Sequence, residues 1–144
     1  MAPPGRGAEF FHADDFNFDG YKDVFLETWH GATGNWGGCI WLYNPATRQF
    51  NYSNEFSKLA GFSLYPKTKT ISTFGRGGMA GKVYVVEQYA IRENRPVLIW
   101  SQNQDWDDSQ KKLHCIVRER VGTKMVVVRD EWSDINGKDP PCVP

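Results

Sequence analysis

A run of oxygen-bearing side chains near the N-terminus has the spacing of a calcium-binding loop. The nonapeptide from residue 15 to residue 23 reads Asp-Phe-Asn-Phe-Asp-Gly-Tyr-Lys-Asp, with such side chains at positions 1, 3, 5 and 9. Ca²⁺ takes about six to eight oxygen ligands from tightly wound loops of this kind. The predicted ligands are the side chains of Asp15, Asn17, Asp19 and Asp23 and the carbonyl oxygen of Tyr21.

The rest of the loop distinguishes it from an EF-hand. Gly20 stands at position 6, where a sharp turn leaves no room for a β-carbon. An EF-hand needs a glutamate at position 12, but Leu26 stands there. The β-branched and aromatic residues that follow predict a strand after the loop. The alternative is an ordinary solvated turn, because Asp, Asn and Gly are common turn residues.

Composition and charge exclude several classes of protein. The 17 basic and 17 acidic residues of this 144-residue chain cancel, which disfavours binding to nucleic acid or to an anionic membrane. No apolar run approaches the roughly 20 residues that span a bilayer. The first seven residues contain no apolar signal-peptide core. We expect one domain of residues 9–144 after a disordered lead of residues 1–8.

The pattern along the chain predicts an all-β fold. Abundant glycine and proline, together with 21 aromatic residues, favour short strands and many turns. Alternating segments separated by turn signals predict successive antiparallel hairpins, in a truncated β-propeller-like or sandwich arrangement. One short helix is expected from Ser53 to Ala60, capped by Ser53 or Asn54 and followed by Gly61. The first strand is expected to end at residues 10–11. The other expected strands span residues 24–30, 39–43, 49–52, 62–65, 70–74, 82–91, 96–103, 112–120 and 124–131.

Three cysteines leave the redox state open. None has CxxC or zinc-ligand spacing. We predict a disulfide between Cys115, on a strand with one buried face, and Cys142, in a tail that needs an anchor. Cys39 would then remain a thiol. The alternative is three reduced cysteines, as in a cytosolic protein.

Catalytic motifs are missing from the sequence. It contains no HExxH, GxSxG or Walker motif, and its three histidines are scattered. The acidic run Asp105–Ser109 is expected at a solvated hairpin tip and not in a pair of catalytic carboxylates. We therefore expect a binding protein and not an enzyme.

Two glycine-rich loops are the candidates for a partner-binding surface. The first presents a tryptophan among small residues, and a large rigid aromatic on a short loop is a good interface anchor. The second carries one cation that could address a carboxylate. We predict that Trp36 is exposed, although tryptophan more commonly folds over a core. The predicted contact residues are Asn35, Trp36, Gly37, Gly38, Arg76, Gly77 and Gly78.

The order of these features resembles a known family. An Asp-x-Asn-x-Asp-Gly-x-x-Asp loop is followed by a strand and a glycine-rich loop with an aromatic residue. Next come the segment from Trp41 to Ser53, a small helix, a Lys-Thr turn and a second glycine-rich loop. From about Phe10 to Trp132 the chain resembles the bacterial periplasmic lysozyme-inhibitor-like immunity proteins of the Xanthomonas type. The calcium motif is also shared with integrin-like propeller repeats and dockerins.

This resemblance implies a function as well as a fold. It implies a bound calcium ion, a periplasmic location, and inhibition of a lysozyme-like peptidoglycan hydrolase that accompanies a bacterial secretion system. The inhibitory surface would lie on the two glycine-rich loops, where Trp36 takes the place of a tyrosine. The alternative is a calcium-stabilised adhesion or carbohydrate-binding module, whose exposed Trp and Tyr side chains stack on sugars.

Overall fold

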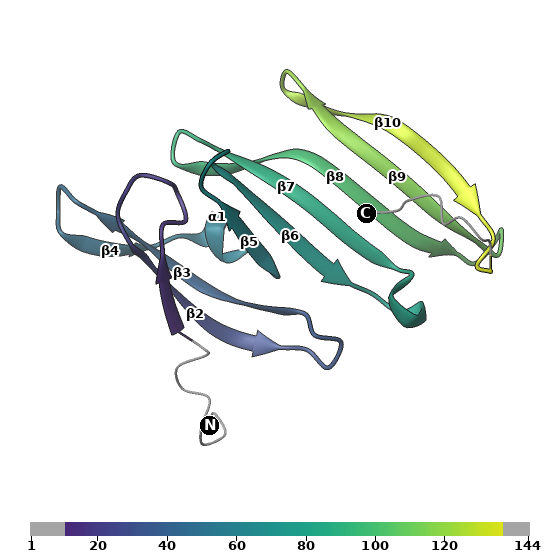
Figure 1. Cartoon of the computed structure of the whole chain (residues 1–144), viewed down its shortest axis with the longest axis horizontal. Coiled ribbons are helices and arrows are strands. Elements are labelled where there is room, and N and C mark those ends of the chain that lie inside the picture. The colour runs from purple at the N-terminus through teal and green to yellow at the C-terminus, as the bar shows by residue number, and fades with distance from the viewer. Residues whose placement is uncertain (1–10, 137–144) are drawn as a thin grey trace.

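The computed structural model describes residues 11–136, which form two antiparallel β-sheets (Figure 1). The first sheet contains β1 (Phe11–Asp14), β2 (Asp23–His30), β3 (Trp36–Asn44) and β4 (Gln49–Tyr52). The second contains β5 (Phe62–Tyr65), β6 (Thr70–Arg76), β7 (Tyr84–Arg92), β8 (Arg95–Asp107), β9 (Lys112–Val121) and β10 (Lys124–Ser133). The helix α1 (Asn54–Ser57) connects the sheets, and a 3₁₀ turn, η1 (Met79–Gly81), lies between β6 and β7.

Strand order in both sheets follows the order of the sequence. Each strand pairs with the one before it, so each sheet is a simple meander. The two sheets lie beside one another without closing into a barrel (Figure 1). The predicted all-β fold of antiparallel hairpins is therefore confirmed.

The main core lies between the sheets and is largely aromatic. Phe16, Phe25 and Ile40 come from the first sheet and its calcium-type loop, and they are at most 1% exposed. The side chains that complete the cluster come from α1 and from the start of the second sheet: Phe56, Leu59, Phe62 and Ile71. The rings of Phe25 and Phe62 meet edge to face, with centroids 5.0 Å apart. Because this core is shared, each sheet depends on the other for burial.

Several predicted boundaries need correction. The first strand was expected to end at Phe11 but continues to Asp14. The helix is one turn long and not two, although Ser53 caps it as predicted, accepting a hydrogen bond from the Phe56 amide at 3.2 Å. Strand β8 continues to Asp107, so only the end of the acidic run lies in the hairpin turn. The alternation of apolar and polar residues predicted where most strands lie, but the turn residues did not predict at which residue each strand ends.

The cysteines occupy different environments. Cys39 is a free, half-buried thiol, and Cys115 is fully buried on β9. Cys142 lies outside the described residues, as does the lead of residues 1–8, so the predicted bridge stays a prediction. Non-reducing peptide mapping is expected to recover a Cys115–Cys142 linked peptide, with Cys39 alkylated. Alkylation of Cys142 without reductant would contradict this pairing.

No helix within residues 11–136 is long and apolar enough to cross a bilayer.

Candidate functional site

The calcium-type loop is held in shape by its own aspartates. Gly20 has φ +93°, a conformation that favours glycine, but a β-carbon there would meet open space and not the clash that was predicted. The Asp15 carboxylate accepts hydrogen bonds from the backbone amides of Asp19 and Gly20, at 3.0 and 2.8 Å. Asp19 accepts one from the amide of Tyr21 at 2.9 Å. These bonds fold the loop back on the Asp15 and Asp19 carboxylates.

Asp23 anchors the end of the loop. Its carboxylate is fully buried and accepts hydrogen bonds from the amides of Phe16, at 2.8 Å, and Tyr43, at 2.9 Å. Burial raises the pKa of Asp23, and the two backbone hydrogen bonds oppose that rise. A buried carboxylate with a raised pKa is an environment in which a nearby cation is stabilising.

Asn17 links the loop to the second sheet. Its side-chain amide donates to Asp19 Oδ2 at 3.0 Å and to Asn94 Oδ1 at 2.7 Å. Asn94 lies in the tight turn between β7 and β8, so this bond joins the two sheets. Asn17 is 8% exposed, and its Oδ1 has no hydrogen-bond partner within the described part of the chain. An unpaired buried oxygen is costly, and it is also an available ligand.

The residues of the loop fit a hard cation better than a soft one. No three His, Cys, Asp or Glu side chains among residues 11–136 gather into a ready metal cluster. The available donors are carboxylate and amide oxygens, which suit Ca²⁺. An ionised carboxylate has about four lone-pair sites, so it can accept an amide hydrogen bond and still bind a cation. The donor chemistry and the orphan oxygen of Asn17 are therefore compatible with calcium.

The two glycine-rich loops lie side by side. Asn35, from the first loop, makes two hydrogen bonds to the backbone of Arg76, in the second. Its side-chain amide donates to the Arg76 carbonyl at 2.7 Å, and its Oδ1 accepts from the Arg76 amide at 2.8 Å. Asn35 was predicted as a partner contact, but here it fastens one loop to the other. We call residues 31–38 and 75–81 together the loop pair.

Two backbone hydrogen bonds of Gly61 connect β3 of the first sheet to β6 of the second, beside the loop pair. The Gly61 amide donates to the Trp36 carbonyl at 2.9 Å, and the Phe74 amide donates to the Gly61 carbonyl at 3.0 Å. Gly61 has φ +57°, and a β-carbon there would lie 2.2 Å from the Phe74 carbonyl oxygen. Any other residue at position 61 would clash with the Phe74 backbone of β6.

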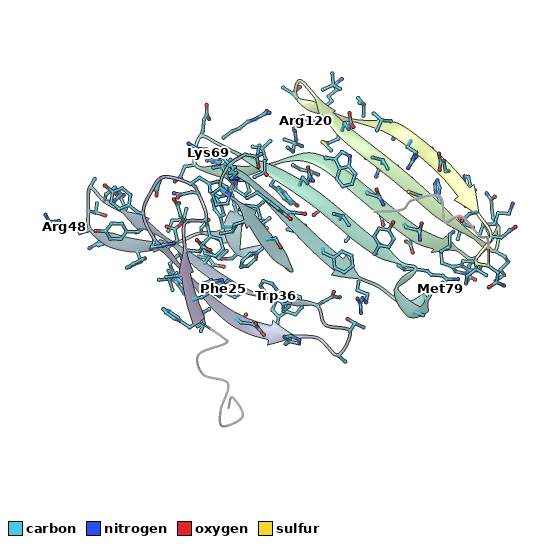
Figure 2. All side chains as sticks on the ribbon, in the orientation of Figure 1. Phe25, Trp36, Arg48, Lys69, Met79 and Arg120 are labelled. Atoms are coloured by element: carbon cyan, nitrogen blue, oxygen red, sulfur yellow. The ribbon has the colours of Figure 1, made fainter. Side chains whose placement is uncertain are left out.

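The prediction that Trp36 is exposed is wrong. Trp36 is partly buried and packs against the main core. Its ring meets Phe62 at a centroid distance of 4.7 Å and Phe25 at 5.7 Å, both edge to face. Figure 2 shows Trp36 beside Phe25, between the two sheets. Three aromatic rings in mutual contact bury more apolar area than one exposed ring does, so the Trp36 side chain packs against the core.

Gly37 and Gly38 are packing residues and do not form an open loop. Both are buried in β3, where they pair with Trp29 and Glu27 of β2. A β-carbon on Gly37 would lie 2.7 Å from the Trp29 ring, and one on Gly38 would lie 2.0 Å from the Leu26 carbonyl oxygen. Their predicted role of offering backbone groups to a partner is therefore corrected: they let β2 approach closely.

Trp29 and Phe74 are two exposed aromatic residues beside Asn35 that were not predicted as contact residues from the sequence. They are 48% and 45% exposed, and both line a cleft of about 190 Å³ between the sheets, beside Asn35. Trp29 lies over Gly37, its cross-strand neighbour, after an irregularity in the pairing of β2 with β3. A tryptophan opposite a glycine in a predicted hairpin was the signal available in the sequence.

The second loop presents its cation to solvent. The Arg76 side chain is exposed and has no ion-pair partner within residues 11–136. Gly77 is partly buried, and its amide donates to the Val83 carbonyl at 2.8 Å, whereas Gly78 is exposed with open space around its α-carbon. In the second loop, Arg76 and Gly78 are therefore exposed to solvent.

Comparison with known proteins gives a structural likeness but no family. No protein-family model matches the chain, and no curated protein matches it. The fold is similar to the solved structure of a type IV secretion system related protein from Xanthomonas, with a TM-score of 0.64 and 20% sequence identity. The match covers 83% of this chain and 58% of the other, so this chain spans little more than half of that neighbour.

Proposed function

We propose that this chain is a calcium-stabilised periplasmic inhibitor that blocks the active-site cleft of a lysozyme-like peptidoglycan hydrolase, as an immunity protein does. The observation that carries the proposal is the loop pair, in which two segments 41 residues apart are locked together beside exposed aromatic side chains. The fold likeness to a secretion-system related protein supports a context in which such hydrolases are exported.

The geometry suits a protein that plugs a preformed cleft. Asn35 and Gly61 fix the loop pair to both sheets, so little conformational entropy is lost when a partner binds. Trp29 supplies a large aromatic anchor, and Arg76 supplies an unpaired cation. The cleft of a glycoside hydrolase contains a pair of carboxylates, to which a guanidinium is complementary. The loop pair therefore combines an anchor, a charge and rigidity.

Calcium has a structural role in this proposal. The loop of residues 15–23 lies before β2, and the loop pair begins where β2 ends. A cation held by Asp15, Asn17, Asp19, Tyr21 and Asp23 would brace β2 and, through Asn94, the second sheet. It would stabilise the surface that contacts the partner without touching the partner.

The test is an inhibition assay with peptidoglycan hydrolases. We expect nanomolar inhibition of at least one among chicken-, goose- and invertebrate-type lysozymes and a secreted hydrolase encoded beside this chain's gene. Trp29→Ala is expected to weaken inhibition about thirtyfold, because truncating an interface anchor costs about 2 kcal/mol. Trp132→Ala, which removes a 38% exposed tryptophan from β10, is the matched control and should leave inhibition unchanged.

Two outcomes would contradict the proposal. The first is that none of these hydrolases is inhibited by the folded wild-type protein. The second is that Trp29→Ala and Arg76→Ala both inhibit as well as wild type, in which case the loop pair is not the contact surface.

A further inference from the structure

A groove lies at the opposite end of the first sheet from the loop pair. It has a volume of about 430 Å³, within the usual range of ligand sites. One wall is the β3–β4 hairpin and the other is the turn between β7 and β8, with α1 between them. The residues that line this groove belong neither to the loop of residues 15–23 nor to the loop pair.

Its lining offers both hydrogen-bond donors and acceptors. Asn44 and Asn94 each use Oδ1 to accept a bond from the protein, from the Ala46 amide and from Asn17. Their Nδ2 groups have no partner in residues 11–136, so two oriented donors remain for a ligand. Acceptors are supplied by the carboxylates of Glu55 and Glu93. A ligand hydroxyl, which both donates and accepts, fits this mixture.

The charge of the groove disfavours anionic ligands. Its ionised side chains are Glu55, Glu93 and Arg95, and Arg95 Nε lies 3.7 Å from Glu55 Oε2. The single cation is therefore already next to a carboxylate, and no excess positive charge remains for a phosphate or an acidic peptide. A neutral polar ligand costs least to desolvate here.

Aromatic residues lie on the face of the β3–β4 hairpin opposite Leu42 and Asn51, and only Tyr43 and Tyr52 among them line the groove. Tyr43 contacts Phe50 at a centroid distance of 5.2 Å, and Tyr52 contacts Trp41 at 5.9 Å. Phe50 and Tyr52 are 51% and 54% exposed. The negative faces of such rings attract the C–H groups of a sugar ring.

From these features we infer that the groove, with Tyr52 at its rim, binds a short neutral saccharide. The groove supplies amide and carboxylate groups for hydroxyls, and Tyr52 supplies a ring face for the apolar side of the sugar. Asn94 ties this site to the calcium-type loop through Asn17. The site is separate from the loop pair, so this inference does not depend on hydrolase inhibition.

The test is a titration of the ¹⁵N-labelled full chain with four neutral tetrasaccharides: chitotetraose, cellotetraose, maltotetraose and mannotetraose. We expect at least one to shift the amide resonances of Asn51, Asn94 and Arg95. Asn51→Leu, which places an apolar side chain in the groove, and Tyr52→Ala are each expected to weaken that binding about tenfold. The matched controls are Asn103→Leu and Tyr65→Ala, which change exposed residues on the second sheet and should bind as wild type does.

The outcomes are decisive in both directions. The absence of shifts with all four sugars at 10 mM ligand, about ten times a weak dissociation constant of 1 mM, would overturn the inference. So would undiminished binding by both groove variants, or tighter binding of tetralysine or tetra-aspartate than of any sugar. Asn51→Leu should inhibit a hydrolase as wild type does. If the wild type inhibits no hydrolase, the proposed function fails while the sugar titration is unaffected.

Discussion

Replacing Trp36 by alanine is expected to lower the free energy of unfolding by about 3 kcal/mol, at the lower end of the range for truncating a buried aromatic side chain. The indole packs edge to face on Phe25 and Phe62, so its removal would leave a cavity in the core that joins the two sheets. Urea unfolding followed by fluorescence or circular dichroism measures the change.

Trp29→Ala is the matched control for this experiment. Trp29 is 48% exposed and lies over Gly37 at the surface, so its loss is expected to cost less than about 1 kcal/mol of stability. The two variants, both in the β2–β3 hairpin, should therefore differ: Trp36→Ala loses stability, whereas Trp29→Ala loses inhibition. A Trp36→Ala protein within about 1 kcal/mol of wild type would contradict the packing described here.

The same pair of residues shows what the sequence could not predict. Glycines around Trp36 are compatible with an exposed loop and also with close packing of a strand, and local pattern does not distinguish these cases. The distinction comes from Phe62, 26 positions away, which lies on the other sheet. Burial of a single aromatic residue is decided by such non-local contacts, and periodicity does not report them.

The strands themselves were more predictable because their signals are local. Alternation of apolar and polar residues and short turn sequences predicted where most strands lie, including the bounds of β4 and β5. The contacts that join the sheets were not predictable in this way. Asn35 meets Arg76 41 positions away, and Asn17 meets Asn94 77 positions away. Asparagine is a common turn residue, so nothing in either local sequence indicated a cross-sheet partner.

The loop of residues 15–23, predicted to bind calcium, is intermediate between these cases. Its ligand spacing and the positive φ of Gly20 follow from the nonapeptide itself. The fully buried position of Asp23, by contrast, depends on the Tyr43 amide in the neighbouring strand β3. A motif can specify the loop, but the sheet decides how strongly the loop is attached to the fold.

Calcium at 100 times its dissociation constant is expected to stabilise the protein by about 2.7 kcal/mol, provided that it binds the folded state alone. Extracellular calcium modules have dissociation constants of about 10⁻⁴–10⁻³ M. A domain of this size should then melt about 5–10 °C higher in saturating calcium than after calcium removal. The physical reason is that the ion satisfies the buried Asn17 oxygen and neutralises carboxylates whose separation is fixed by the fold.

Three comparisons make the measurement specific. Asp19→Ala should abolish the calcium response, because it removes a predicted ligand near the exposed side of the loop. Asp108→Ala, which removes a carboxylate from the β8–β9 turn, should keep the response. Mg²⁺ at the same concentration should stabilise less than Ca²⁺, since it demands a smaller octahedral site.

Hydrogen exchange would show whether the ion also acts across the sheets. If the Asn17–Asn94 bond transmits the effect, calcium should slow amide exchange in the β7–β8 turn as well as in the loop. Protection confined to residues 15–23 would limit the ion to a local role. Equal melting temperatures with and without calcium in the wild-type protein would contradict the assignment, and the loop would then be held by its hydrogen bonds to its own backbone amides.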